Sequence, residues 1–447
     1  MPNLNDKTKV INGRNPLAKN NRPPFARCEA TEAALWLQDG EYHVGFSGAA
    51  QYEGVMNNGA IVDFKLESDK KCLNGIVAKN TDTVIFAPKI TLSGEGCSDF
   101  SCKGAAILTM DGSKVDIRGG DIVTRGCTRS ATIATTGSTL KVWGANLATY
   151  GGPLPEDYVP VIGPGMMEPP APLGLGGNCR THLSMDNSET YFYDCNIYAD
   201  AWAALSTDSS GGYVYLEAND CKIDVENNGY IIYADNGCHV TLDRCEVSSG
   251  NVFGIQDGNS TVYMRQVNGD CKGYGFLIHG GMHDLEDIGT VRVIDCDLTS
   301  AGPMFRCKST NSDIYVKDSK ITCTEGVLLE TVLTDDSFYY QTRTHADDEY
   351  GVQFTFENTE MFGDMNCLDP ERQTCLNFVS TALTGGITGA PKLQLTEGST
   401  FVATKDSEIT LIGSYEGIDA SAGVTVTAIC GKSETISLPS GGTLVLK

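Results

Sequence analysis

The sequence predicts an all-β solenoid in which short parallel strands stack from one coil to the next. One sequence pattern repeats about every 25 residues. Ala105–Gly126, for example, aligns with Ser130–Gly151 so that glycines match glycines and apolar residues match apolar residues. Each copy holds short alternating apolar runs separated by Asp-Gly, Asp-Asn, Asn-Gly or Gly-Gly, which are typical of strands and turns. A unit of this size cannot bury its own apolar face, so successive copies must stack on one another.

The predicted elements follow in order along the chain. Residues 1–30 are expected to form an extended basic arm, because lysine and arginine predominate over the single acid Asp6 before residue 28. The remaining divisions are a cap with the first coils at residues 31–104, the main solenoid at residues 105–401, and the last coils with a second cap at residues 402–447.

Three long insertions interrupt the repeats at residues 152–177, 281–289 and 331–350. Loops of this length in a compact domain usually serve binding. The alignment places all three beside the same strand of the coil. We therefore expect them to wall a groove over the outward face of that strand.

The charge and hydropathy of the chain exclude several classes of partner. A formal net charge of −24 over 447 residues disfavours nucleic acid, anionic membranes and polyanionic substrates. No run of 18 apolar residues is present, so no membrane-spanning helix is predicted. Residues 1–25 lack the apolar core of a signal peptide, which favours a cytoplasmic protein, and secretion is the alternative if a leader has been removed. The composition is compatible with a homo-oligomer.

Many of the 17 cysteines occupy one position of the repeat. Cys195, Cys221, Cys245 and Cys296 each follow Asp or Arg and lie two residues before Ile, Val or Leu, and Ser319 takes this place in another coil. A cysteine side chain behaves as a small buried hydrophobe, which suits a narrow corner of the coil. We expect a structural ladder of buried, mostly reduced thiols. No Cys-x-x-Cys pairs have zinc-site spacing, so no metal site is predicted.

The repeat length, the stacked Cys and Ser positions and the phrase V-x-V-x-D-C-x-I resemble the right-handed parallel β-helix superfamily of pectin-lyase-like proteins. The resemblance covers about Ala105–Phe401 and implies a right-handed parallel β-helix of about nine to eleven coils. The superfamily includes pectate lyases, polygalacturonases, uronate epimerases and bacterial surface β-helices, so the fold does not specify the activity. The chain matches neither the Asp-rich calcium motif of pectate lyases nor the paired-Asp motifs of polygalacturonases, and no catalytic residue is carried over.

The aligned repeats predict which side chains face the core. The predicted core column is Leu108, Ile133, Leu183, Leu205, Ile232, Leu277, Phe305 and Leu328. Because side chains alternate along a strand, the neighbouring positions should point outward. On this reasoning His182, Tyr233 and Arg306 face the groove, whereas His279 falls on the inward parity and is expected to be a core or turn histidine.

Five residues are candidates for acid–base chemistry because they lie on the predicted groove face or in the insertions that flank it. They are His182, Asp208, Tyr233, Tyr339 and His345. Imidazole, carboxylate and phenol groups can each exchange a proton with a substrate. The alternatives are structural: an aspartate before Ser or Asn can close a turn, and tyrosines in a loop can anchor it.

A second set is expected to bind substrate. It consists of Asp186, Gln256, Arg306, Lys308, Tyr340 and Arg343. Arg306 and Lys308 are cations in an acidic protein, and they could neutralise a carboxylate or a developing enolate, or pair with neighbouring aspartates. Asp257, which precedes Gly258, is read as a turn residue.

These observations favour an enzyme without an organic cofactor that acts by acid–base chemistry. The expected step is proton abstraction next to a carbonyl or carboxylate, as in a lyase, epimerase or double-bond isomerase, on a glycoside or small cyclic substrate. No P-loop, dinucleotide fingerprint, G-x-S-x-G or H-E-x-x-H motif is present. The alternatives are a non-catalytic glycan-binding or adhesin β-helix, and a glycoside hydrolase that uses two carboxylates such as Asp186 and Asp208.

Overall fold

The computed structural model describes residues 31–43, 46–96, 102–153, 179–208, 212–280, 287–334 and 351–447. Every regular element within these ranges is a β-strand, and they contain no helix long and apolar enough to cross a membrane. The chain divides into two compact units, residues 1–251 and residues 252–447. The predicted arm and most of the three insertions lie outside the described residues, and their roles stay predictions.

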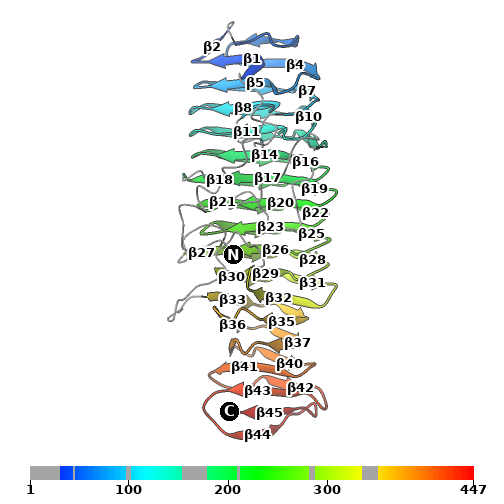
Figure 1. The fold of residues 1–447 in the computed structure, drawn as a ribbon, viewed down its shortest axis with the longest axis vertical. Coiled ribbons are helices and arrows are strands. Elements are labelled where there is room, and N and C mark those ends of the chain that lie inside the picture. The colour runs from blue at the N-terminus through cyan, green and yellow to red at the C-terminus, as the bar shows by residue number, and fades with distance from the viewer. Residues whose placement is uncertain are drawn as a thin grey trace, which may run out of the picture. The chain divides into compact units, whose positions relative to one another are not determined.

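Unit 1 consists of three stacks of strands, and each stack contributes one strand to a coil (Figure 1). The first stack contains β1 (Glu32–Gln38), β5 (Leu73–Lys79), β8 (Ile107–Met110), β11 (Thr132–Ala134), β14 (Arg180–Met185), β17 (Trp202–Asp208) and β20 (Gly229–Ala234). The second contains β6 (Asp82–Phe86), β9 (Lys114–Arg118), β12 (Thr139–Trp143), β15 (Glu189–Tyr193), β18 (Val214–Asn219) and β21 (Cys238–Asp243). The third contains β7 (Lys89–Leu92), β10 (Asp121–Arg125), β13 (Asn146–Tyr150), β16 (Asn196–Ala199), β19 (Lys222–Val225) and β22 (Glu246–Ser249).

Unit 2 repeats this plan. Its first stack contains β23 (Val252–Asp257), β26 (Phe276–His279), β29 (Phe305–Lys308), β32 (Val327–Val332), β35 (Asp364–Cys367) and β38 (Ile387–Thr388). Its second contains β24 (Thr261–Arg265), β27 (Ile288–Ile294), β30 (Asn311–Lys317), β33 (Gly351–Glu357), β36 (Gln373–Val379), β39 (Lys392–Thr396), β41 (Ser407–Ile412), β43 (Thr425–Ile429) and β45 (Thr443–Leu446). The remaining stacked strands are β25 (Asn268–Cys271), β28 (Asp297–Ser300), β31 (Lys320–Cys323), β34 (Glu360–Phe362), β37 (Ala382–Gly385), β40 (Thr400–Ala403) and β42 (Ile418–Ala420).

Within each stack the strands pair in parallel with the corresponding strand of the next coil. In unit 1, for example, Leu108 pairs with Ile133, and Ile133 pairs with Leu183. Antiparallel pairs occur towards the ends of the chain: β2 (Glu41–Tyr42) lies against β1, β3 (Glu53–Asn57) against β4 (Ala60–Ser68), and β44 (Glu434–Ser437) against β45. The predicted all-β fold with parallel stacked strands is confirmed.

The cysteine column lies at the turn between the second and third stacks. The residue before each cysteine has a positive φ, 55° at Asp220 and 50° at Arg244, so the chain turns sharply there. The Cys221 thiol donates to the Asn219 carbonyl at 3.2 Å and accepts from the Cys195 amide at 3.5 Å. The ladder therefore satisfies backbone groups of the turn as well as filling its corner.

The predicted state of this ladder is confirmed. Cys195, Cys221, Cys245 and Cys296 are buried and carry no disulfide. Of the cysteines in the described part of the chain, Cys72 is the one that is disulfide-bonded. In unit 2, Ser319 makes the same contacts as its cysteine counterparts, since it donates to the Lys317 carbonyl and accepts from the Cys296 amide. A thiol and a hydroxyl thus make equivalent hydrogen bonds at this position of the coil.

The faces of the first stack differ from the sequence prediction in unit 1. The ring of His182 packs edge-on against the ring of Phe192, with 5.0 Å between the ring centroids. Phe192 is fully buried and lies on the inward side of β15. His182 therefore points into the coil, and the prediction that it faces outward is wrong. Leu183, the next residue, lies on the opposite face of β14 by alternation.

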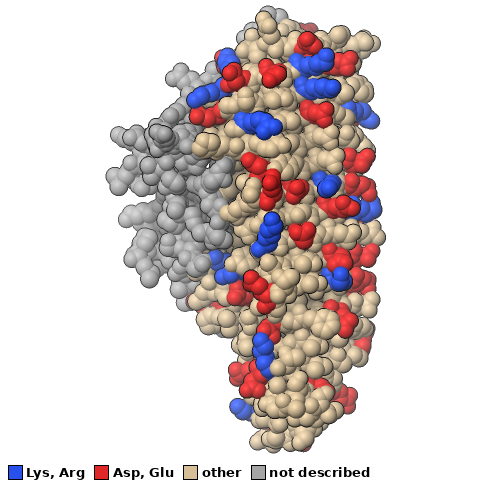
Figure 2. Space-filling view, turned by 90° about the vertical axis from the view of Figure 1, so that its right-hand side faces the viewer, with Lys and Arg blue, Asp and Glu red and all other residues tan. Residues whose placement is uncertain are grey.

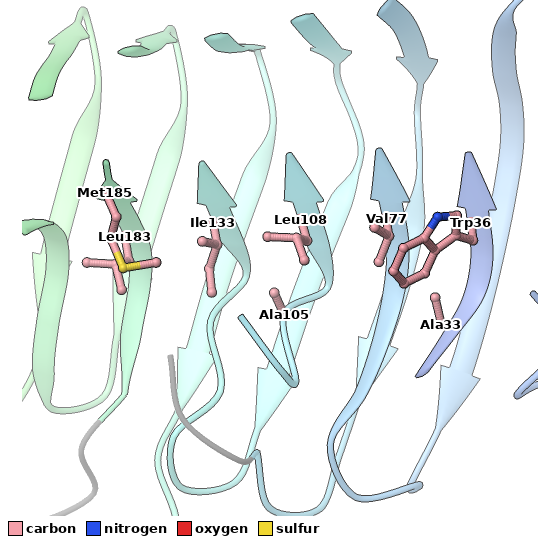
Figure 3. Packing of buried hydrophobic residues seen from close by; sticks show 8 residues of the cluster. All are labelled: Ala33, Trp36, Val77, Ala105, Leu108, Ile133, Leu183 and Met185. Atoms are coloured by element: carbon pink, nitrogen blue, oxygen red, sulfur yellow. The ribbon is translucent and has the colours of Figure 1, made fainter. Parts of the chain in front are cut away.

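Part of the apolar column that was expected in the coil interior, namely Leu108, Ile133 and Leu183, is instead an outward-facing cluster in unit 1. Leu205 and Ile232 face inward as predicted, because they continue the register of His182. Figure 3 shows Leu108, Ile133 and Leu183 in line on successive strands, with Val77 and Trp36 continuing the row. All these side chains are buried. Both faces of the first stack are thus withdrawn from solvent, so burial alone does not reveal which face is the coil interior.

Candidate functional site

Aromatic packing identifies the two faces of the first stack in unit 2. The rings of Phe276 and Phe305 are stacked, with 5.4 Å between their centroids. The Phe305 ring also packs edge-on against the ring of the inward-facing Phe354 of β33, again with 5.4 Å between centroids. Phe276 and Phe305 are therefore core residues, as predicted for Phe305. The alternate residues of β26 and β29 lie on the opposite, outward face.

Charged residues occupy that outward face in one column. Asp257 at the end of β23 pairs in register with His279 at the end of β26, and His279 pairs with Lys308 at the end of β29. Parallel strands lie about 4.8 Å apart, so the three side chains follow one another along the stack. The predicted outward orientation of Lys308 is confirmed. The inward orientation predicted for His279 is wrong.

The Asp257 carboxylate and the His279 imidazole form a close pair. Oδ1 of Asp257 lies 3.2 Å from Nδ1 of His279, and the two side chains are 0% and 1% exposed. Lys308 is also buried. The two atoms are within ion-pair distance but do not form a hydrogen bond of good geometry. A carboxylate this close stabilises, through its charge, the imidazolium that forms when the ring accepts a proton. This arrangement can carry out general acid–base chemistry at Nε2.

Arg306 lies on the same outward face, two residues before Lys308. Its Nη1 donates to the Tyr274 hydroxyl at 2.5 Å and lies 3.2 Å from Oε2 of Glu330. The guanidinium also lies over the Tyr274 ring, 4.7 Å from the centroid. Its Nε is buried and has no hydrogen-bond partner. Arg306 is therefore held in one orientation, and one of its buried donors is left unpaired.

The other residues predicted to bind substrate lie elsewhere. Gln256 points away from this face, since it pairs in register with Ile278 and donates to the Gly258 carbonyl at 2.7 Å. Asp257 takes the outward position instead. Asp186 has a φ of 49° and accepts a hydrogen bond from Thr135 at 3.0 Å, which is the geometry of a turn residue.

Of the candidate acid–base residues in unit 1, His182 lies on the opposite face of the first stack from Asp208 and Tyr233. His182 lies in the coil interior, where it is hydrogen-bonded to Thr132 at 2.8 Å and to Ser184 at 2.7 Å. Burial lowers the pKa of His182 to about 3, so the ring is neutral near pH 7. Tyr233 is buried on the outward face, and Asp208 ends β17. The remaining candidates, Tyr339, Tyr340, Arg343 and His345, lie outside the described residues.

Sequence reasoning missed Asp257 and His279 as a pair. The available signal was that both residues end a strand of the same stack and precede glycine. Within the ranges that the structure describes, no three His, Cys, Asp or Glu side chains are placed to hold a metal ion. Asp257, His279, Lys308 and Arg306 can supply proton transfer and charge stabilisation at this face.

No protein-family model matches the chain, and no curated protein is significantly similar to it in sequence.

Proposed function

We propose that this protein is a right-handed parallel β-helix enzyme that needs no organic cofactor and acts by acid–base chemistry at the outward face of unit 2. The observation that supports this most strongly is the buried Asp257–His279 pair, with Oδ1 and Nδ1 3.2 Å apart and Lys308 next in register. Burying a carboxylate, an imidazole and an amine on one strand face is costly, and such groups gather at sites of chemistry.

Each residue has a distinct role in the proposed reaction. His279 removes a proton next to a carbonyl or carboxylate of the substrate, while the charge of the Asp257 carboxylate stabilises the imidazolium that forms. Lys308 and Arg306 then stabilise the negative charge that develops on the substrate oxygen. Return of the proton at another position gives an isomer or epimer, and loss of a leaving group gives a lyase product.

The net charge of the protein limits the class of substrate that it can bind. Figure 2 shows acidic side chains spread over the face that it presents, with basic ones between them, and the net charge is −24. A polyanion would be repelled by a protein with this net charge. A neutral or singly charged molecule, either a glycoside or a small cyclic compound, is the substrate class that we propose.

Substitution of His279 tests the assignment. We expect His279→Gln to lower turnover by about 10²–10⁴-fold, as is typical when an acid–base group is lost. Asp257→Asn should lower turnover as well, because the ring loses the negative charge that stabilises its protonated form. The matched control is His239→Gln on β21 of unit 1, which should leave turnover unchanged.

The assay must report proton transfer directly. Small cyclic enones and neutral glycosides would be incubated with the protein in D2O, and deuterium incorporation followed by NMR together with ultraviolet absorbance. Wild-type turnover by a folded His279→Gln variant would contradict the proposal. The absence of any exchange by the wild-type protein across both substrate classes would favour a binding protein.

A further inference from the structure

The outermost strands at one end of unit 1 are β2 and β3. Among the described strands, β2 pairs with β1 alone and β3 pairs with β4 alone (Figure 1). Each of the two therefore keeps one edge whose backbone N–H and C=O groups face no other described strand. Such an edge is a template for pairing with another chain, and soluble proteins usually block it.

Large apolar side chains are exposed at the same end. Val55 and Met56 of β3 are 63% and 40% exposed, and Tyr42 of β2 and the nearby Phe46 are 42% and 49% exposed. Tyr42 is hydrogen-bonded to Tyr52, which directly precedes β3, so the two strands share one surface. A solenoid normally ends in a capping repeat with a polar outer face. Exposed apolar surface at this end therefore marks a place where a partner binds.

The charge on β3 indicates which partner fits. The one charged residue of the strand is Glu53, and its carboxylate is paired with Nζ of Lys65 at 3.1 Å. Residues 54–57 are uncharged. With a net charge of −24, two copies of this chain repel each other over most of their surface, so a contact between copies needs an uncharged strand of this kind.

We propose that the free edge of β3 is the interface between two copies of this chain, which pair antiparallel about a two-fold axis at Val55. In this register Gly54 lies opposite Met56 of the partner subunit, and Glu53 lies opposite Asn57 of the partner subunit. No like charges face each other across the pair. The contact closes at two copies, as isologous contacts do. It involves none of the residues assigned to proton transfer in unit 2 and stands independently of the proposed reaction.

Sedimentation velocity of the full chain over a series of concentrations tests the proposal. The wild-type protein should show a monomer–dimer equilibrium. Val55→Lys should raise the dissociation constant at least about tenfold, because two lysines meet at the axis without a counter-charge. Val55 is mostly exposed, so this substitution should leave the monomer folded. Added NaCl should tighten the dimer, because salt screens the repulsion between two acidic copies.

A matched control and a second measurement separate this interface from general stickiness. Phe362→Lys replaces an exposed apolar residue on β34 of unit 2, 57% exposed, and should dimerise as the wild type does. Hydrogen exchange of the β3 amides should slow on dimerisation in the wild type. A wild-type protein that stays monomeric at every concentration would overturn the proposal, as would larger open assemblies or a dimer that Val55→Lys does not weaken. Exchange of the β3 amides that is equal in monomer and dimer would also overturn it.

Discussion

Two buried histidines, one in each unit, differ in the charge of their neighbours and in the face of the strand that they occupy. His182 in unit 1 points into its coil and is enclosed by neutral groups, Thr132 at one ring nitrogen and Ser184 at the other. His279 in unit 2 lies on the outward strand face between a carboxylate and an amine. Burial is nearly complete in both cases, so it is the charge of the neighbours and the face of the strand that distinguish a structural histidine from a candidate catalyst.

The same contrast holds for two arginines. Arg129 in unit 1 is completely buried, and its five N–H groups donate to five backbone carbonyls. Burial lowers the pKa of Arg129 to about 10, which leaves it charged near pH 7. Arg306 in unit 2 is partly exposed and keeps an unpaired Nε. An arginine whose N–H groups are all hydrogen-bonded within the protein is expected to have a structural role. An arginine that keeps an unpaired N–H group is a candidate for binding.

The largest expected effect on stability comes from Arg129. Arg129→Met should lower the free energy of unfolding by at least about 3 kcal/mol, because five buried carbonyl oxygens lose a charged donor. Arg306→Met should cost about 1 kcal/mol or less, since its ion pair is partly solvated. Urea denaturation of both variants checks the difference, and equal losses would show that the two arginines do not differ in role.

A pH titration of stability sharpens the comparison of the histidines. The pKa of His182 is about 3 in the folded protein and about 6.5 in the unfolded chain, so below pH 6.5 the unfolded state binds the extra proton. Stability from this residue is fully present above pH 6.5 and falls by about 1.4 kcal/mol per pH unit towards pH 3.

His182→Gln isolates that contribution. The variant should be less stable than the wild type at pH 7 but should lose less stability between pH 6.5 and pH 4, since it lacks the titrating ring. Thermal unfolding at several pH values measures both quantities. An unchanged slope of stability against pH in His182→Gln would place the acid sensitivity in other groups.

The smallest expected effect concerns the cysteine ladder. Cys221→Ala should destabilise unit 1 by about 1–2 kcal/mol, because it leaves a small cavity and removes the thiol that contacts the turn. Cys221→Ser should cost less, since Ser319 makes the equivalent contacts in unit 2. Turnover should be unchanged in both variants. If serine proves as harmful as alanine, the corner selects for apolar volume and not for hydrogen bonding.

The sequence predicted the solenoid better than it predicted the faces of its strands. Counting alternate residues placed Arg306 and Lys308 outward correctly but reversed His182 and His279. The count fails because the aligned column is off by one residue between coils: Leu183 pairs with Ser206 and not with Leu205, and Leu277 pairs with Arg306 and not with Phe305. One extra residue moves every later side chain to the other face.

The sequence by itself determined the repeat, the turn positions and the cysteine column, because these depend on local backbone preferences that recur in every coil. The tertiary structure alone decided that Asp257 meets His279 and that His279 lies beside Lys308. Those contacts join residues from different coils whose lengths vary, so their register depends on how each coil packs against the next. A pairing set by packing between coils is not encoded in any one repeat.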